Sequence, residues 1–347
     1  MMKVQKTIQF SKKWQRMIAA MLVFVLAATF MAACGNTQSE VDTSPSPAPT
    51  AAPNDTDANS GDPYALGVPL LWRATSPAGQ SIYLFGSIHV GNAELYPLPD
   101  FIMDAFHRSD YLAVEFNLNE MDEDLMMAIG LMQFYLDGRT IVDDIGEELF
   151  ELGMEIFRRF GNPLIDVMPM MRPFAWHSML TSLAAEAAGL SGEMGIDMHF
   201  IDLAEEIGME ILEVESAMEQ FEMLAGFSLP LQVSMLASAI TYFDESVAGV
   251  TDLLEMWRHG DLQGILQLAT EEVTGLYGEY LELMEELMEE YWTAMMTQRD
   301  IHMTQVARSY MAQGKNVFFM VGLMHFIVED GIIDLLRQEG YEVVRIR

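Results

Sequence analysis

Two histidines stand at the same spacing behind two apolar runs near opposite ends of the chain. The tetrapeptide 86–89, Gly-Ser-Ile-His, follows Tyr-Leu-Phe, and the tetrapeptide 322–325, Gly-Leu-Met-His, follows Phe-Met-Val. A glycine at the end of a strand permits a close backbone turn, and sites in α/β sheets form at the carboxyl ends of strands. Neutral imidazole is both a common metal ligand and a general base near neutral pH. The repeated spacing therefore predicts that His89 and His325 share one site, with two unrelated histidines as the alternative.

A carboxylate stands in a third apolar run. Glu115 belongs to the segment Leu-Ala-Val-Glu-Phe at 112–116. Burying a carboxylate costs free energy unless it is paired or bound to a metal. Two histidines and one carboxylate form a familiar ligand set with open positions, so we expect His89, Glu115 and His325 to hold one divalent ion. Glu215, just after the apolar segment 209–214, could face the same cleft, either as a further ligand or as a residue that supports the ligands, and it is the candidate that takes a proton in a hydrolase.

The segments that carry these residues predict a sheet built from both ends of the chain. Residues 70–74 and 81–85 are typical of a β-hairpin around the turn sequence Ser-Pro-Ala-Gly at 76–79. We expect a helix at 101–108 and a buried strand at 111–116. The far end predicts a strand at 317–321, a helix at 327–337 and a strand at 341–346. The expected fold class is α/β.

The middle of the chain, residues 120–312, has a different composition. It is rich in Met, Leu, Glu and Ala with helical spacing, and the chain holds 30 methionines. We expect a large helical region with one strand at 209–214, preceded by a helix at 196–206. Most methionines should fill the core, since an unbranched thioether adapts to irregular gaps, with a Met-lined peptide groove as the alternative. Residues 271–311 could form one long helix or two.

The N-terminal residues predict export and lipidation. A basic start is followed by an apolar stretch at 17–31, which has the length of a secretory signal rather than of a transmembrane helix. It ends at Cys34, which is the only cysteine of the chain. We therefore expect a lipoprotein signal at 1–33, acyl chains such as palmitate on Cys34, a disordered stalk at 34–66 and one domain at 67–347. The expected location is the outer face of the cell membrane.

The charge balance excludes one class of partner. The chain has 52 Asp and Glu against 18 Lys and Arg, a formal net charge of −34. Such a surface repels phosphate backbones, so we expect no nucleic-acid binding. Among so many acids, Arg172 and Arg299 should pair with carboxylates, although a bidentate clamp on a substrate carboxylate is the alternative.

In order and spacing, these segments resemble the TraB/GumN family, which includes PrgY and the animal Tiki proteins. The resemblance covers about 70–347 and rests on the two Gly-x-x-His segments and Glu115. The central block from 195 to 220, Gly-Ile-Asp followed by Leu-Glu-Val-Glu-Ser and Gln220, also fits, as does Arg299. Asp300 departs from the asparagine expected there, and the residues after His325 depart from the family's usual glycine position. Asp197 and His199 are secondary candidates for the site, although Asp197 could simply favour a helix N-terminus.

The resemblance implies a fold similar to erythromycin esterase and a metal-dependent hydrolase that acts on peptides or secreted proteins. Zn, Mn or Co would be the cofactor, with His89, Glu115, His325 and Glu215 as the catalytic group. Two alternatives remain at this stage. One is a lipoprotein that binds peptides without cleaving them, and the other is a metal-free hydrolase that uses a histidine as general base.

Overall fold

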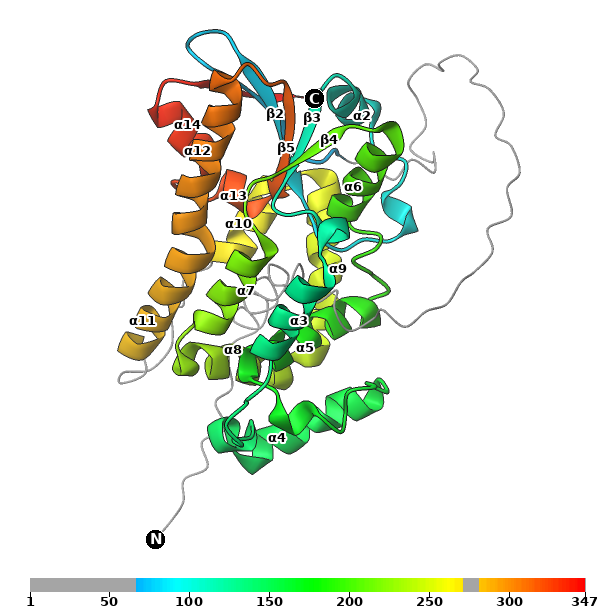
Figure 1. Ribbon diagram of the computed structural model, residues 1–347, viewed down its shortest axis with the longest axis vertical. Helices are drawn as coiled ribbons and strands as arrows, with labels where there is room; N and C mark the ends of the chain where they lie inside the picture. The colour runs from blue at the N-terminus through cyan, green and yellow to red at the C-terminus, as the bar shows by residue number, and fades with distance from the viewer. Residues whose placement is uncertain (1–66, 271–280, 347) are drawn as a thin grey trace, which may run out of the picture.

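The computed structural model describes residues 67–270 and 281–346. The expected signal, Cys34 and stalk lie outside these residues. The fold is mixed α/β and mostly helical, with one six-stranded sheet in the order β4-β3-β5-β2-β1-β6 (Figure 1). The strands are β1 (Leu71–Thr75), β2 (Ser81–Ser87), β3 (Tyr111–Val114), β4 (Glu210–Glu213), β5 (Val317–Gly322) and β6 (Glu342–Ile346).

The sheet joins the two ends of the chain, as the sequence predicts. β1 and β2 form the hairpin, whose turn closes with Gly79 at a φ of 90° and its N–H donating to the Ser76 carbonyl. β5 lies between β2 and β3 and runs parallel to both, with Gly86 opposite Val321 and Ser87 opposite Gly322. The two Gly-x-x-His segments therefore leave the same edge of the sheet from neighbouring strands.

Aromatic side chains pack on both faces of this sheet. Phe85 contacts Phe200 of α6 (Ile196–Ile207) and Trp257 of α9 (Phe243–His259) on one face. Successive strand residues point to opposite faces, and Phe319 meets Tyr310 of α12 (Gln298–Ala312) on the other. Because both faces are covered, all six residues of β5 are buried, which explains its unbroken apolar sequence.

The helical half lies beyond the carboxyl ends of the parallel strands (Figure 1). Its own core is centred on Trp176, which packs against Phe157, and it includes the methionines Met154, Met168 and Met171. These methionines take the core role that the composition predicts. The helices here are α3 (Glu123–Met132), α4 (Val142–Arg159), α5 (Pro173–Ala187), α7 (Ala217–Gly226), α8 (Leu229–Thr241), α10 (Leu262–Thr270) and α11 (Leu281–Trp292).

One expected helix differs in detail from the structure. The helix expected at 327–337 is two helices, α13 (Met324–Ile327) and α14 (Ile332–Gln338), separated by Asp330 at a φ of 57°. A left-handed residue cannot continue an α-helix, so His325 sits on a short helix of its own. Of the stretch 271–311, for which one helix or two were expected, residues 271–280 lie outside the described residues, and from 281 on α11 continues into α12 through a π-helical segment, Thr293–Thr297.

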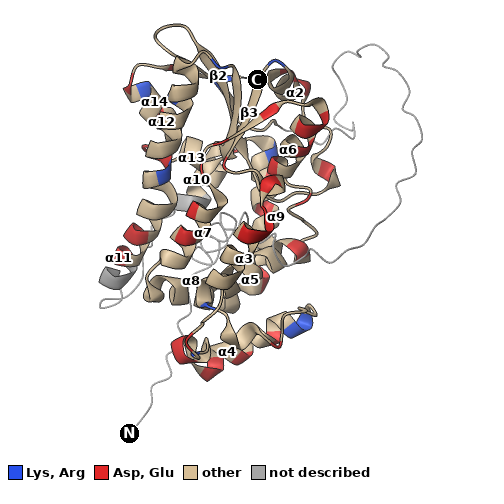
Figure 2. Cartoon of the chain, in the orientation of Figure 1, with Lys and Arg blue, Asp and Glu red and all other residues tan. Residues whose placement is uncertain are grey.

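No single helix among the described residues is long and apolar enough to cross a membrane. α7 and α8 meet that test only as a pair, bent by 94°. Acidic side chains lie on most of the helices, and basic ones are few (Figure 2).

Candidate active site

The glycines of the two Gly-x-x-His segments bring the strand ends together. A Cβ on Gly86 would lie 2.3 Å from Leu323 Cδ1 and 3.0 Å from Leu323 Cα, so this position needs a glycine. The Leu323 N–H donates to the Ser87 carbonyl at 3.0 Å, which continues the pairing past the ends of β2 and β5. The close approach fixes the two following histidines relative to each other.

The three predicted site residues surround one point, which is the position that a Cβ atom on Gly322 would occupy. An ideal Cβ on Gly322 would lie 3.4 Å from Glu115 Oε1, 3.7 Å from His89 Nε2 and 3.7 Å from His325 Cδ2. The structure thus brings His89, Glu115 and His325 together, although 236 positions separate the two histidines. Glu115 follows β3, the strand on the other side of β5 from β2.

His89 is held by the first turn of α6. Its Nδ1 lies 2.8 Å from Asp197 Oδ2, and the Ser87 hydroxyl donates to the other oxygen of Asp197 at 2.8 Å. A Cβ on Gly195 would lie 2.3 Å from the His89 carbonyl oxygen, so the glycine lets α6 begin against the His89 loop. The Gly-Ile-Asp block at 195–197 is therefore the element that orients His89.

The protonation of His89 is set by its neighbours. Burial alone would lower the pKa of His89, but the charge and hydrogen bond of Asp197, together with the charge of Glu115, raise it to about 9. In the absence of another ligand, the ring is thus charged at neutral pH and donates to Asp197. The His89 side chain is 13% exposed, which leaves it reachable from solvent.

His325 is held in the same manner by a different helix. Its Nδ1 lies 2.6 Å from Asp300 Oδ1, and both side chains are almost fully buried. Burial raises the pKa of Asp300, against the opposing hydrogen bond and charge of His325. Sequence reasoning did not include Asp300 in the site. A signal was present, because Asp300 falls in register with Met303, Ala307 and Met311 on the buried stripe of α12.

Glu115 and Glu215 share one cation. Arg299 Nη2 lies 2.7 Å from Glu115 Oε2 and 2.7 Å from Glu215 Oε2, and the amide of Gln220 donates to both carboxylates. The Gly322 N–H donates to Glu115 Oε1 at 2.8 Å. Arg299 is thus paired with carboxylates, as the acidic composition predicts, and Glu215 is the second acid of this ion pair.

This network determines the charge of Glu115. Burial favours the neutral acid, but the charges of Arg299, His89 and His325 and the Gly322 N–H hold the pKa of Glu115 well below its usual range. Burial also opposes the charge of Arg299, yet the two glutamates raise the pKa of its guanidinium. Glu115 is therefore an anion whose two oxygens both accept hydrogen bonds.

The remaining candidate of the sequence, His199, has a different environment. Its ring stacks on Tyr96 at 4.4 Å between centroids and meets Phe200 edge-on. Burial lowers the pKa of His199. Its contacts are those of an aromatic packing residue within α6, whereas Asp197 two residues earlier contacts His89 directly.

The donor set fits a divalent metal in part. Each histidine gives its Nδ1 to a carboxylate, which is the usual support for a histidine that binds a metal through Nε2. Glu115, however, has both oxygens engaged by Arg299, Gln220 and the Gly322 N–H. Within 67–270 and 281–346, no group of three or more His, Cys, Asp and Glu is arranged to hold a metal ion. The two imidazoles fit the metal, and the carboxylate as placed does not complete the set.

Comparison with known proteins gives consistent relatives at low identity. The Metalloprotease TIKI homolog of Amphimedon queenslandica is 22% identical over 80% of this chain and 61% of that protein. Metalloprotease TIKI2 of Danio rerio is 23% identical over 79% of this chain and 60% of its own length, so this chain spans about 60% of the TIKI proteins. The Uncharacterized protein YbaP of Escherichia coli (strain K12) is 23% identical over 76% of this chain and 90% of YbaP.

No solved structure matches the chain, so the expected likeness to erythromycin esterase stays a prediction. The model of the TraB/PrgY/gumN family matches residues 70–345, which is essentially the whole described domain and contains both Gly-x-x-His segments. The chain belongs to the TraB/PrgY/gumN family.

Proposed function

We propose that this protein is a lipid-anchored hydrolase that cleaves peptide bonds in peptides or secreted proteins outside the membrane. The observation that carries the proposal is the convergence of His89 Nε2, Glu115 and His325 on one point above Gly322. The similarity to two proteins named metalloproteases supports the reaction class.

The two aspartates give both histidines a defined chemical role. A carboxylate on Nδ1 fixes the ring, stabilises its charged form and presents Nε2 to the reacting atoms. His89 is the more accessible of the two, and in its neutral form, which a pKa of about 9 makes the minor form at neutral pH, it accepts a proton from the attacking water and then returns it to the leaving amine. His325 is almost fully buried, and its ring borders the shared point above Gly322. The ion-pair network of Glu115, Arg299 and Glu215 fixes the position of Glu115 beside the two histidines.

A divalent ion, Zn, Mn or Co, would be held by His89 and His325, with Glu115 as the nearest carboxylate. When bound, it would lower the pKa of a bound water and polarise the scissile carbonyl. His89 would hold the ion as a neutral ring, with Asp197 accepting the hydrogen bond of the proton on Nδ1. Arg299 would retain Glu215 as its partner if Glu115 turned toward the ion.

A metal-free hydrolase is the second candidate, and one observation favours it. Glu115 is already ion-paired with Arg299 and accepts three hydrogen bonds, so it is not poised to coordinate a cation. His89 with Asp197 then forms an acid–base pair of the kind found in hydrolases that use no metal, and its base form becomes the major one only above a pH of about 9.

The test is to measure metal content and hydrolysis on the full chain purified in mild detergent. A mixture of synthetic peptides serves as substrate, products are identified by mass spectrometry, and each assay is run with and without a chelator. About one bound metal per chain and chelator-sensitive cleavage are the expected result. Cleavage that is insensitive to the chelator supports the metal-free site instead. Absence of products under every condition, from a folded and metal-loaded protein, refutes the hydrolase proposal.

The proposed location rests on the N-terminal sequence, with Cys34 as the lipid attachment site. Replacing Cys34 with alanine should move the protein from the membrane fraction to the soluble fraction or block its processing, because acyl chains provide the lasting anchor. Fractionation followed by mass spectrometry of the N-terminus checks this expectation. A processed Cys34→Ala protein that remains wholly with the membrane contradicts it.

A further inference from the structure

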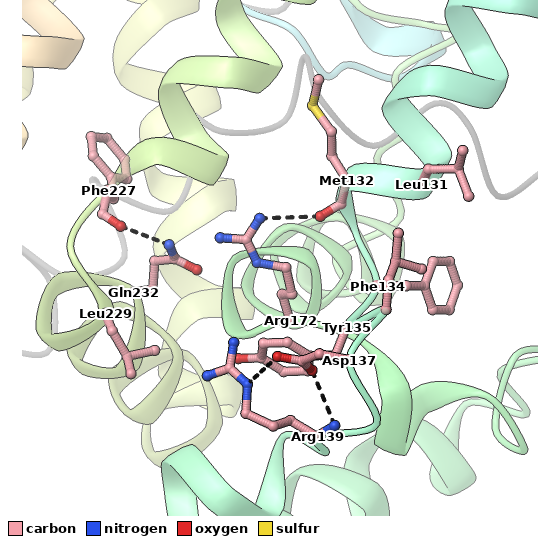
Figure 3. Close-up of a pocket in the computed structure, with 11 residues that line it drawn as sticks. Leu131, Met132, Phe134, Tyr135, Asp137, Arg139, Arg172, Phe227, Leu229 and Gln232 are labelled. Carbon is pink, nitrogen blue, oxygen red and sulfur yellow. Dashed lines mark hydrogen bonds and ion pairs between the residues drawn. The ribbon is translucent and has the colours of Figure 1, made fainter.

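A second cavity lies in the helical half, away from the two histidines. It has a volume of about 610 Å³ and lies between the end of α3, the start of α5 and the corner between α7 and α8 (Figure 3). The residues that matter for its chemistry are Leu131, Leu136, Arg139, Arg172, Leu229 and Gln232.

Arg172 gives this cavity a positive charge, and the carboxylate in the same lining, Asp137, pairs with Arg139. Its guanidinium donates to the carbonyls of Met132 at 3.3 Å and Ala225 at 2.8 Å and lies over the ring of Phe174. In the part of the chain that the structure describes, no carboxylate forms an ion pair with Arg172, in contrast to Arg299. The acidic composition predicts pairing for both arginines, and for Arg172 that expectation is not met. A guanidinium has five N–H donors, and two backbone carbonyls neither use them all nor neutralise the charge.

Gln232 adds a buried acceptor that lacks a donor. Its side chain is only 3% exposed, and its Nε2 donates to the carbonyls of Phe227 and Ala225. Its Oε1 is buried without a hydrogen-bond partner among the described residues. Arg172 and Gln232 extend toward each other across the cavity (Figure 3). A ligand that satisfies both must bring an anionic acceptor and, close to it, a hydrogen-bond donor, and the Gln232 amide must turn to expose Oε1, which is covered in this structure.

Part of the rim of the cavity is apolar. Leu131 is 53% exposed, Leu136 78% and Leu229 42%, and these three leucines share the rim with the exposed ion pair of Asp137 and Arg139. Exposed leucines that gather at the mouth of a cavity indicate a surface that another apolar group covers. The ligand therefore carries an apolar side chain next to its charged end.

We propose that this cavity binds the free C-terminal carboxylate of a peptide whose last residue is apolar. The terminal carboxylate pairs with Arg172 bidentately, and the last amide N–H donates to Gln232 Oε1. The terminal side chain packs on the three leucines. A fatty acid supplies the carboxylate and the apolar chain but no N–H, so the unpartnered acceptor of Gln232 favours the peptide.

The cavity is physically linked to the candidate active site. α7 carries Gln220, which contacts Glu115 and Glu215, and five residues later Ala225, whose carbonyl accepts from Arg172. With a rise of 1.5 Å per residue, the two contacts are about 7.5 Å apart along the helix axis. Binding at the cavity does not require hydrolysis, so the proposal stands or falls independently of the proposed function.

The test measures binding to the full chain in detergent with a chelator present, so that metal-dependent cleavage cannot remove the probe. The probe is a fluorescent hexapeptide that ends in leucine with a free carboxylate. The comparison peptide has the same sequence with a C-terminal amide. Fluorescence anisotropy should show that amidation weakens binding to the wild type by about tenfold or more, since it removes a charge-assisted pair. This comparison uses the unaltered protein and so does not depend on the folding of any variant.

Two arginine variants locate the effect. Arg172→Met should remove the difference between acid and amide, whereas Arg139→Met should preserve it, because Arg139 is an exposed arginine at the same cavity that already pairs with Asp137. Thermal unfolding of each variant confirms that it is folded. Equal affinity of the wild type for acid and amide overturns the proposal, as does loss of the difference in Arg139→Met but not in Arg172→Met. Displacement of the peptide by decanoate at equal concentration overturns the choice of a peptide.

Discussion

His89 and His325 leave neighbouring strands three residues after a glycine, yet the two histidines have different surroundings. His89 lies in a loop, is 13% exposed and takes its carboxylate from the first turn of α6. His325 lies on a short helix, is 3% exposed and takes its carboxylate from α12. The same spacing therefore brings both rings to the point above Gly322, whereas the helix that packs behind each ring decides how accessible that ring is.

The comparison extends to the helices themselves. α6 contributes to the site through Asp197, whereas α12 contributes both Asp300 and Arg299, which ties Glu115 to Glu215. Changes on the α6 side should therefore affect chemistry more than stability. Changes on the α12 side should affect both.

Loss of either imidazole is expected to have the largest effect. His89→Ala and His325→Ala should each lower hydrolysis by about 10²–10⁴-fold, because a positioned acid–base or ligand group contributes on that order. His107→Ala is the control, since His107 is exposed and outside the site. Turnover per folded molecule, with folding checked by circular dichroism, is the measurement. Full activity of either site variant would show that its histidine takes no part in hydrolysis.

Removing the shared cation should give the largest loss of stability. Arg299→Met leaves Glu115 and Glu215 buried without their partner, so the free energy of unfolding should fall by ~3–5 kcal/mol. Asp197→Asn, on the α6 side, should cost only about 1 kcal/mol because asparagine still accepts a hydrogen bond. Urea unfolding of both variants makes the comparison.

A rescue variant sharpens this prediction. Adding Glu115→Gln to Arg299→Met removes one of the two stranded charges and should restore part of the lost stability. If the double variant is less stable than Arg299→Met alone, charge is not what Arg299 supplies. Equal losses in Arg299→Met and Asp197→Asn would remove the distinction between the two helices.

The two motif glycines should respond differently to alanine. Gly86→Ala places a methyl 2.3 Å from Leu323 Cδ1 and should destabilise the fold by about 1–3 kcal/mol through overpacking. Gly322→Ala makes only ordinary contacts of 3.4–3.7 Å and should fold, but its methyl occupies the point that the site residues share. Hydrolysis by Gly322→Ala should fall by about 10²-fold, since misplacement of about 1 Å at a reacting centre has that effect.

Gly130→Ala provides the matched control for the two glycines. Gly130 lies inside α3, and a Cβ there meets nothing within 4 Å, so the change should leave activity intact and stabilise the helix slightly. Thermal unfolding and turnover of all three variants are compared. A stable Gly86→Ala protein, or an unfolded Gly322→Ala protein, would contradict the packing described for the strand ends.

The smallest expected effect is a pH dependence specific to His89. The folded pKa of His89 is raised from 6.5 to about 9, so the charged ring stabilises the folded state fully below pH 6.5. That contribution is lost as the pH rises through about 9. In chelator, the difference in Tm between the wild type and Asp197→Asn should therefore be larger near pH 6 than near pH 9.5. A difference that stays constant across this range would show that the Asp197 pair does not depend on the charge of His89.

The sequence predicted those features that depend on a few adjacent residues within one helix, strand or turn. Strands ending in glycine, the hairpin turn at 76–79 and the helix starting at 196 follow from patterns of a few residues, and the structure has them. The helix break at Asp330 was not predicted, because a left-handed residue other than glycine has little sequence signature. The partner of His325 was also not predicted, since Asp300 is 25 positions away and the pairing depends on how α12 packs on the sheet.

The sequence by itself determined that two histidines and Glu115 follow buried strands, because apolar runs of strand length bury their backbone and carry the next residue to a sheet edge. It also determined that arginines are scarce among acids. Only the tertiary structure decided which acids Arg299 joins and that Arg172 joins none among the described residues. The physical reason is that ion pairs form between side chains from elements far apart in the chain, and the desolvation that gives them their strength exists only after those elements pack.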